Sequence, residues 1–326
     1  MAGGESRERT ALIVTVLDEA DTIDTLLESI AVQTRPPDEV VVVDGGSRDG
    51  TWERLESWRA RLPLQLIRAP GASIARGRNL AIDAASASLI AVTDAGVRLE
   101  PDWLAELHAA LSEDTDVISG FFTAETSTTF EHAMGATVLP DVEDIHPHAF
   151  LPSSRSVLFR RAAWSAVGGY PEWLDYCEDL VFDLALKRAG HRFAFAPRAR
   201  VWFRPRGSLL AFFRQYFRYA RGDGKADLFR RRHAIRYVTY AALAILLCRR
   251  GAGLALLPIG VALYTRRPYA RLLPLIDGLS LRQVAYALAL VPAIRLVGDV
   301  AKMLGYPVGV WWRLRHKGSW TSRSSS

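Results

Sequence analysis

Short apolar runs alternate with helical patterns along the N-terminal part of the chain, and this alternation constrains the fold more than any other feature. The runs at residues 11–17 and 39–43 have the composition of buried strands, and a short strand at residues 64–68 and a fourth strand at residues 89–93 follow them. Segments with helical spacing follow the first three strands, at residues 20–32, 51–60 and 74–84. Strands that alternate with helices of these lengths predict an α/β fold with a doubly wound, mostly parallel sheet.

The pattern continues less regularly after these elements. A helix is predicted directly after Pro101, and the later elements are strands at residues 117–122, 156–160 and 193–196 and a helix at residues 179–189. The polar stretch that ends near Pro152 shows no clear periodicity, so no element is predicted there.

The charge distribution divides the chain into two parts of opposite sign. Residues 1–200 contain 19 Lys and Arg against 31 Asp and Glu, a net charge of −12, whereas residues 201–326 contain 22 against 4, a net charge of +18. Basic residues interleaved with apolar and aromatic ones suit an anionic lipid surface, where each cation contributes about 1 kcal/mol. A nucleic-acid-binding arm does not need the Leu, Ala, Ile and Val runs of this part, so membrane lipids are the predicted partner and nucleic acid is not.

The basic part contains an amphipathic segment and three apolar runs. Residues 207–233 predict an amphipathic helix region that lies in a membrane interface. The apolar runs at residues 234–248, 251–265 and 284–294 are short, since a fifteen-residue helix spans only about 22 Å of a hydrocarbon core about 30 Å thick. We predict membrane-embedded or membrane-associated helices over residues 234–315, either as short spans or as a hairpin that does not cross, and the number of crossings stays open.

The two ends and the two cysteines bear on the cellular location. Residues 1–9 and 316–326 are predicted as a disordered lead and tail, and the lead lacks the apolar segment of a secretory signal. Cys177 and Cys248 are too few for a disulfide framework. The acidic part is therefore expected to face the cytoplasm at the cell membrane, which is the inner or plasma membrane.

Acidic residues stand at the boundaries of three predicted elements. Asp44 closes the second strand and opens a Gly-rich turn, and Asp94 follows the fourth strand. Glu178 and Asp179 open a predicted helix. Open parallel sheets bind ligands at the carboxyl ends of their strands, so we expect Asp44, Asp94 and Asp179 to gather around one crevice. The alternatives are plain turns or caps for the first two, and stabilisation of a helix N-terminus for the acidic pair.

A series of motifs, in order along roughly residues 10–225, resembles glycosyltransferase family 2, which has the GT-A fold. These motifs are Thr15-Val16-Leu17-Asp18-Glu19, Asp44, Arg76-Gly77-Arg78-Asn79, Asp94 as the first residue of D-x-D, Glu178-Asp179 as the ED motif, and Gln215-Tyr216-Phe217-Arg218-Tyr219 as Q-x-x-R-W. The last motif is typical of the membrane-bound branch of the family. The resemblance implies a GT-A catalytic domain over residues 10–206.

The resemblance also implies an inverting sugar transfer from a nucleotide diphosphate, UDP in preference to GDP, to a lipid-linked or saccharide acceptor at the membrane. Asp179 is expected to be the catalytic base, with Glu178 beside it. The residues expected to bind the donor are Thr15, Leu17, Glu19, Asp44, Arg76, Asn79, Asp94 and Ala95. The residues expected to contact the acceptor or the diphosphate are Ser154, Arg155, Gln215, Arg218, Tyr219 and Arg221.

Two positions depart from the family pattern. Gly96 stands where the family places the second aspartate of D-x-D, its usual metal ligand. A divalent cation, Mg²⁺ or Mn²⁺, would then be held by Asp94 and phosphate oxygens, and His146 and His148 are further candidates unless they are plain loop residues. Tyr219 replaces the Trp of Q-x-x-R-W, which keeps an aromatic face but weakens the expectation of a polymer-making enzyme.

Two other functions compete with sugar transfer. A nucleotidyltransferase would carry a Gly- and Lys-rich phosphate loop near the first strand, and the sequence has none. A non-catalytic module that binds nucleotide sugars is suggested by Gly96, but the presence of both Glu178 and Asp179 argues against it.

Overall fold

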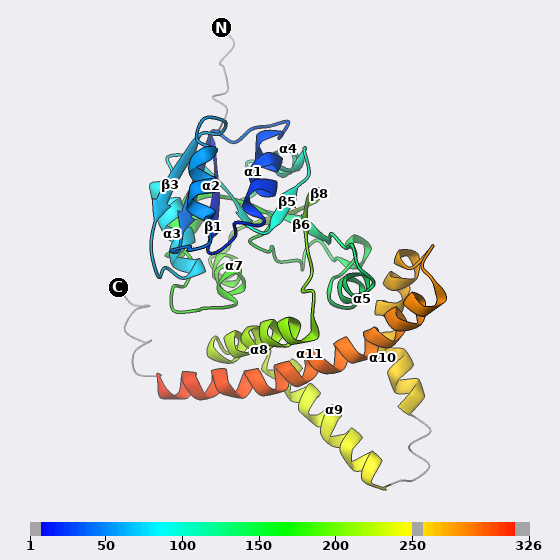
Figure 1. Cartoon of the computed structure of the whole chain (residues 1–326). Coiled ribbons are helices and arrows are strands. Elements are labelled where there is room, and N and C mark those ends of the chain that lie inside the picture. The colour runs from blue at the N-terminus through cyan, green and yellow to red at the C-terminus, as the bar shows by residue number, and fades with distance from the viewer. Residues whose placement is uncertain (1–7, 250–256, 317–326) are drawn as a thin grey trace. The chain divides into compact units, whose positions relative to one another are not determined.

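The computed structural model describes residues 8–249 and 257–316, which form two compact units (Figure 1). The first unit contains the described residues up to Ala124 together with Asp141–Arg204. The second contains Glu125–Pro140 and the described residues from Pro205 onward. The segment Glu125–Pro140 therefore leaves the first unit and returns to it.

The first unit is built on one eight-stranded sheet with the order β3-β2-β1-β4-β7-β6-β8-β5. The strands are β1 (Thr10–Val16), β2 (Glu39–Asp44), β3 (Leu64–Arg68), β4 (Leu89–Asp94), β5 (Val97–Leu99), β6 (Val117–Ala124), β7 (Val157–Arg160) and β8 (Phe193–Phe203). Strands β3, β2, β1 and β4 are parallel, as are β6 and β8, whereas β7 and β5 run antiparallel to their neighbours. The predicted α/β fold with a mostly parallel sheet is confirmed.

Helices cover both faces of this sheet because successive strand residues point to opposite sides. Along β1, Leu12 and Val14 pack in one apolar cluster, and Ala11 and Ile13 pack in the other. The first cluster is covered by α1 (Ile23–Ala31), α2 (Thr51–Ser57) and α4 (Trp103–Ala109). The second is covered by α3 (Ile74–Ala84), α6 (Arg161–Ala166) and α7 (Glu178–Arg188).

The order of the sheet reverses between β1 and β4. From β1 the chain adds β2 and β3 on one side and then returns to place β4 on the other side. The strand ends are level, since Val16 pairs with Asp44 and Thr15 pairs with Asp94. Such a reversal leaves a crevice at the carboxyl ends of the strands, which is where open α/β sheets bind ligands.

The second unit consists of helices around an apolar core. They are α5 (Thr129–Val138), α8 (Leu209–Lys225), α9 (Arg230–Arg249), α10 (Leu257–Leu272), the short 3-10 helix η3 (Leu273–Leu275) and α11 (Leu281–Arg315). Helix α5 contributes Ala133 and Met134 to the core, and α11 contributes Val291 and Ile294. The sequence predicted no element at α5 or at the 3-10 helix η1 (Val142–Asp144) of the first unit, because both lie in the polar stretch before Pro152.

Two boundaries in this unit differ from the predicted ones. The amphipathic helix expected over residues 207–233 ends at Lys225, because Asp227 and Phe229 adopt positive φ angles of 61° and 53° that interrupt it. The following Arg230 begins α9. The apolar run at residues 284–294 is part of α11, a single helix of 35 residues that continues through Pro292 and Pro307. Part of the predicted run at residues 251–265 lies outside the described residues.

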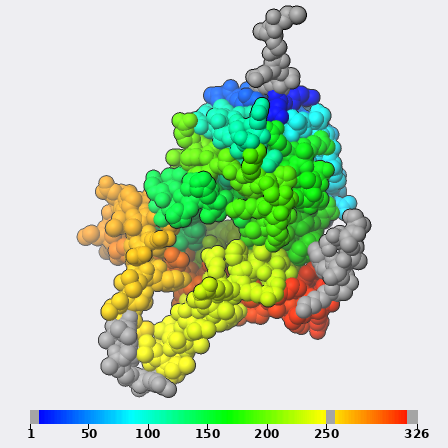
Figure 2. Space-filling view, turned by 180° about the vertical axis from the view of Figure 1, so that it is seen from behind, coloured from blue at the N-terminus to red at the C-terminus, as the bar shows by residue number. Residues whose placement is uncertain are grey.

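Within the described residues, α11 is the one helix long and apolar enough to cross a membrane by length and composition. Its apolar window has a mean hydropathy of 1.7 and is 39% buried inside the protein. Helix α9, yellow in Figure 2, leaves most of its described side chains at the surface, and Ile235 and Val238 are among the exposed apolar ones. The second unit therefore presents apolar side chains that water does not favour.

Helices α8 and α11 approach each other backbone to backbone. A Cβ atom added at Gly309 would lie 2.0 Å from the carbonyl oxygen of Arg221, and one added at Gly305 would lie 2.2 Å from that of Phe217. On α8, a Cβ atom at Gly224 would lie 2.3 Å from the carbonyl oxygen of Tyr306. Only glycine fits at these three positions, and small residues of this kind permit the closest packing of helices.

Candidate active site

The loops after β1 and β2 are joined by hydrogen bonds from side chains to backbone. Asp44 is buried, and its Oδ1 accepts hydrogen bonds from the backbone nitrogens of Gly46 (3.0 Å) and Ser47 (2.9 Å) and from the Ser47 hydroxyl (2.7 Å). The backbone of Arg48 donates to Asp18 Oδ1 at 2.8 Å. These contacts fix one rim of the strand ends, and they engage the Asp44 carboxylate with its own loop.

Glu19 lies in the loop after β1 and also forms hydrogen bonds near the strand ends. Its backbone nitrogen donates to the Thr51 hydroxyl at 2.8 Å, and its carboxylate accepts a short hydrogen bond from the Thr22 hydroxyl. Thr15 faces α3 at Gly77, where a Cβ atom would lie 2.7 Å from the Thr15 methyl group. Gly77 thus lets α3 lie close to β1, and α3 is the helix that carries Arg78.

Arg78 lies between two carboxylates that belong to different elements. Its Nη2 donates to Asp94 Oδ1 at the end of β4 at 2.9 Å, and its Nη1 donates to Glu178 Oε1 at the start of α7 at 2.8 Å. Arg78 is 3% exposed, so these ion pairs form away from bulk water. The buried guanidinium therefore brings the D-x-D position and the ED motif to the same edge of the sheet.

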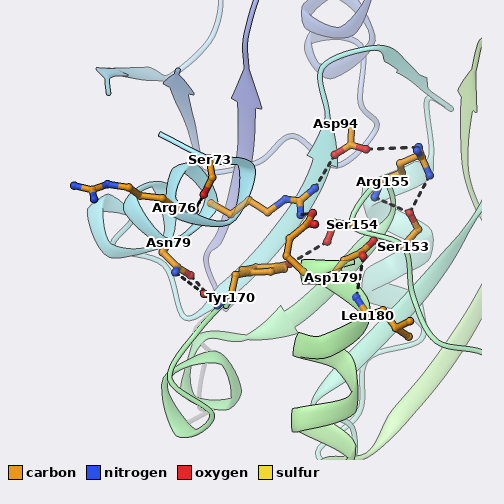
Figure 3. A network of polar contacts seen from close by, with 12 residues as sticks. Ser73, Arg76, Asn79, Asp94, Ser153, Ser154, Arg155, Tyr170, Asp179 and Leu180 are labelled. Atoms are coloured by element: carbon orange, nitrogen blue, oxygen red, sulfur yellow. Dashed lines mark hydrogen bonds and ion pairs between the residues drawn. The ribbon is translucent and has the colours of Figure 1, made fainter. Parts of the chain in front are cut away.

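Arg155 reaches Asp94 from the other side (Figure 3). Its Nε lies 3.5 Å from Asp94 Oδ2, and its guanidinium lies over the Phe203 ring, 4.8 Å from the centroid. The Thr93 hydroxyl donates to the carbonyl oxygen of Arg155 at 2.8 Å, which fixes the backbone at this position. Asp94 is therefore flanked by two guanidinium groups.

Helix α7 begins with the two acidic residues that the sequence placed there. Glu178 is buried, whereas Asp179 is half-buried, and Leu180 donates its backbone N–H to Asp179 Oδ1 at 2.8 Å. Burial, and then the negative charge of Asp179, raise the pKa of Glu178 to about 7, against the opposing effect of Arg78. Burial also raises the pKa of Asp183, one helical turn further along α7. Burial therefore raises the pKa of both buried carboxyl groups of α7, and the ion pair with Arg78 limits the rise at Glu178.

The Tyr170 ring packs against Arg78, the centre of the cluster. The Arg78 guanidinium lies 5.3 Å from the centroid of its ring, and the ring stacks on Phe182 with centroids 4.2 Å apart. Its hydroxyl lies 3.2 Å from the Ser154 hydroxyl, in a buried contact (Figure 3). Burial raises the pKa of the Tyr170 hydroxyl. Tyr170 thus keeps its proton and supplies a neutral face under Arg78.

The structure separates the two other residues of the Arg76-Gly77-Arg78-Asn79 motif from this cluster. Arg76 is exposed and points away from Asp94 in Figure 3. Asn79 binds the loop before α7 instead, since its Oδ1 accepts from the Tyr170 backbone at 2.9 Å and its Nδ2 donates to the Tyr170 carbonyl oxygen at 2.9 Å. The guanidinium beside the carboxylates is that of Arg78, which the sequence analysis did not select.

The predicted residues distribute over the two units. The cluster around Arg78 contains or adjoins five of them: Asp94, Glu178, Asp179, Arg155 and Ser154. Asp44 lies at the end of β2, which is separated from β4 by β1. The remaining donor-site candidates of the first unit are Thr15, which is half-buried, Leu17, which is exposed, and Ala95, which is buried.

The three candidates of the Q-x-x-R-W-like motif and the nearby Arg221 belong to the second unit. Gln215, Arg218, Tyr219 and Arg221 all lie on α8, and the Gln215 side-chain amide donates to the Tyr219 hydroxyl at 2.8 Å. Arg218 and Arg221 line a hollow on this helix together with Phe213, Arg214 and Phe217. The α8 surface is therefore basic and aromatic, as the sequence predicts for an interface helix.

The surroundings of Gly96 bear on the divalent cation. A Cβ atom at Gly96 would lie 3.8 Å from Glu19 Oε2, so a carboxylate from the β1 loop stands close to where the missing aspartate side chain would extend. His146 and His148 are exposed, and residues 8–249 and 257–316 contain no group of three or more His, Cys, Asp or Glu that could hold a metal ion. Glu19 therefore joins Asp94 as a candidate ligand for a cation shared with donor phosphates.

Two family models match the chain over much of its length. The model described as glycosyl transferase family 2 matches residues 11–162, and the one described as glycosyl transferase family group 2 matches residues 89–296. The succinoglycan biosynthesis protein ExoA of Rhizobium meliloti is 30% identical over 251 residues, which cover 69% of this chain and 72% of ExoA.

Solved structures share the fold at low sequence identity. The mannosyltransferase PcManGT from Pyrobaculum calidifontis, in complex with GDP-Man and Mn²⁺, has a TM-score of 0.54 and 21% identity over 97% of this chain and 88% of that chain. TarS of S. aureus in complex with UDP-GlcNAc has a TM-score of 0.52 and 19% identity over 94% and 92% of the two chains. The family models and the ExoA relationship agree with the sheet and the motif positions, and the chain is a glycosyltransferase that belongs to glycosyltransferase family 2.

Proposed function

We propose that this glycosyltransferase performs an inverting transfer of a sugar from a nucleotide diphosphate to a lipid-linked or saccharide acceptor at a membrane, with UDP-sugars ahead of GDP-sugars as donors. The observation that carries the proposal is the pair of ion pairs made by Arg78, which joins the strand end of Asp94 to the helix that bears Asp179. The donor side and the acceptor side of a transfer reaction thereby share one edge of the sheet.

Asp179 is the proposed general base. The acceptor hydroxyl oxygen attacks the anomeric carbon and forms the new glycosidic bond, while the bond from that carbon to the diphosphate breaks and its electron pair leaves with the nucleotide. Asp179 takes the proton of the hydroxyl, for which it must come within about 2.6–3.2 Å of the acceptor oxygen. Its half-buried position leaves it open to an acceptor, unlike the buried Glu178.

Negative charge develops on the leaving diphosphate, and fixed cations stabilise it. Arg155 is the half-buried guanidinium beside Asp94, and we assign it to this task together with Ser154 as a polar neighbour. Arg78 is too buried to leave its two carboxylates, so we assign it to positioning Asp94 and Glu178.

Asp94 and Glu19 would hold a divalent cation, which neutralises diphosphate charge when it is bound. Asp44, Thr15, Leu17 and Ala95 complete the proposed donor site at the ends of β1, β2 and β4. PcManGT was solved with Mn²⁺ and GDP-Man and TarS with UDP-GlcNAc, and both kinds of donor occur with this fold.

Four residues of α8 are assigned to contacts with the acceptor or the diphosphate: Gln215, Arg218, Tyr219 and Arg221. The apolar α11 and the charge of +18 over residues 201–326 support attachment to an anionic membrane, with the catalytic unit on the cytoplasmic side. We keep residues 10–206 as the proposed catalytic domain and residues 207–315 as the membrane-associated part.

The test is a comparison of wild type and Asp179→Asn, with sugar transfer and nucleotide binding measured in parallel. Loss of a positioned general base lowers the rate by about 100-fold to 10,000-fold. We expect a fall of this size in kcat, with the thermal stabilisation by UDP unchanged because Asp179 is not assigned to the donor. Equal transfer rates in the two proteins would refute the role of Asp179, and an absence of transfer in both would favour a non-catalytic binding module.

A further inference from the structure

Asp299 on α11 is the centre of a polar network inside the helical unit. It is 7% exposed, and its Oδ1 accepts a hydrogen bond from Arg236 Nε of α9 at 2.8 Å. Its Oδ2 accepts from the hydroxyl of Tyr240 at 3.1 Å and from the hydroxyl of Tyr264 on α10. Both oxygens of Asp299 are therefore engaged by groups on the neighbouring helices.

Two further cations of α11, Arg295 and Lys302, lie at this network, and neither forms an ion pair with a carboxylate in the part of the chain that the structure describes. The Arg295 guanidinium lies 4.8 Å from the centroid of the Tyr264 ring, and its buried Nε has no hydrogen-bond partner among the described residues. The Lys302 ammonium lies 4.8 Å from the centroid of the Tyr216 ring. Aromatic faces attract these cations but accept no strong hydrogen bond from them.

The charges around Lys302 are mostly positive. Lys302 interacts electrostatically with Arg232, Arg236 and Arg295, all of the same sign, and with Asp299, which has the opposite sign. A further carboxylate of this unit, Asp223 on α8, contacts His233, whose Nε2 lies 3.1 Å from Asp223 Oδ2. Partly buried charges of one sign are costly unless an opposite charge accompanies them. An anion with several oxygen acceptors would therefore stabilise this cluster of cations.

We infer that Arg295 and Lys302 bind a phosphate group, supplied by the head of a membrane lipid or by a soluble diphosphate. Phosphate oxygens accept hydrogen bonds from a guanidinium fork and from an ammonium at once, and this match makes Arg and Lys the usual phosphate ligands. Tyr216, which contacts Lys302, belongs to the same motif of α8 as Gln215 and Arg218. A lipid-linked acceptor would bring such a phosphate to α8, and this identification of the ligand rests on the proposed function.

The experiment measures the thermal unfolding of the full chain, purified in detergent, with three separate additions: phosphatidylglycerol, phosphatidylcholine and inorganic pyrophosphate. A ligand that binds the folded protein raises the Tm according to its concentration and affinity. We expect phosphatidylglycerol to raise the Tm and phosphatidylcholine to have a much smaller effect. A shift with pyrophosphate as well would support the site and show that soluble diphosphates can also occupy it.

The double variant Arg295→Gln with Lys302→Gln should need about 30-fold more phosphatidylglycerol for the same shift, because it lacks the two cations assigned to the phosphate. The matched control is Arg282→Gln, which removes the same charge from an exposed position of α11 and should respond as wild type does. The charge-preserving variant Lys302→Arg should also respond as wild type does, which separates loss of charge from loss of folding.

The inference is overturned if the double variant responds to all three additions as wild type does, or if phosphatidylcholine stabilises wild type as strongly as phosphatidylglycerol does. Stabilisation by UDP is recorded in the same samples. UDP binding tests the proposed donor site, which does not include Arg295 or Lys302. A chain that binds phosphatidylglycerol through these two residues but binds no nucleotide would therefore retain this site and lose the proposed function.

Discussion

Single residues decide the charge balance of the candidate active site, and Arg78 shows this most directly. It is a buried cation between Asp94 and Glu178, two carboxylates that are far apart in the sequence. The sequence did contain a signal for it. Helix α3 buries Ala75, Arg78 and Ala81, so the helical period places an arginine on the apolar face of a helix, where only a partnered charge is stable. The partners themselves could not be predicted, since they depend on tertiary contacts.

Replacement of Arg78 by methionine should destabilise the protein. The variant leaves Glu178 buried without its ion-pair partner, and the loss of one member of a buried pair costs about 3–5 kcal/mol. We expect a fall of this order in the free energy of unfolding, measured by urea denaturation. Arg76→Met is the control, because Arg76 is exposed two residues away and its replacement should cost less than about 0.5 kcal/mol. Equal stability of the two variants would contradict the bridging role of Arg78.

The raised pKa of Glu178 predicts how stability depends on pH. The carboxyl group has an ordinary pKa of 4.5 and a folded-state pKa of about 7, so between these values the folded protein holds a proton that the unfolded chain has lost. Stability should therefore fall as the pH rises through this window. Glu178→Gln removes this titration, and its Tm should change less over the same range than that of wild type. Parallel Tm profiles in the two proteins would show that another group is responsible.

Packing between elements depends on glycines of α8 and α11. Gly309→Ala should destabilise the protein, because the added Cβ atom meets the Arg221 carbonyl oxygen at 2.0 Å and overpacking typically costs about 1–3 kcal/mol. Gly260→Ala, in α10, is the matched control, since a Cβ atom there has nothing within 4 Å. It should be neutral or stabilising, because alanine favours a helix over glycine by about 1 kcal/mol. The measurement is the Tm of the full chain in detergent, and a Gly309→Ala protein as stable as Gly260→Ala would contradict the close approach.

The elements that the sequence predicted best are those with a simple period. Strands β1, β2 and β4 are continuous apolar runs, which bury both faces, whereas β3 is short and partly exposed; all four are observed. Helix α5 was missed because its segment is polar and small in residue size, although its capping box at Thr128 and Glu131 was a readable signal. The end of α8 at Lys225 was also missed. The helix is interrupted by the positive φ angles of Asp227 and Phe229, and neither residue is a glycine or proline, the residue types that usually mark a helix end in a sequence.

The whole molecule joins an acidic α/β unit to a basic helical unit, and the difference predicts how it is held on membranes. If α11 crosses the bilayer, neither high salt nor alkaline carbonate should release the full chain from membranes, because burial of an apolar helix does not depend on charge. If only the basic surface held the protein, high salt would release it, since screening weakens surface electrostatics. Sedimentation of washed membranes, followed by detection of the chain in pellet and supernatant, distinguishes the two attachments.

The contact of bare backbone between α8 and α11 has a mechanical consequence. Two helices with side chains between them can slide when those side chains change rotamers. Gly305 and Gly309 have no side chains, so their backbone lies directly against α8. We therefore expect α8 and α11 to move together as one rigid body. If a thicker or thinner bilayer tilts α11, then α8 tilts with it, and so do Gln215 and Arg218, the residues proposed to contact the acceptor.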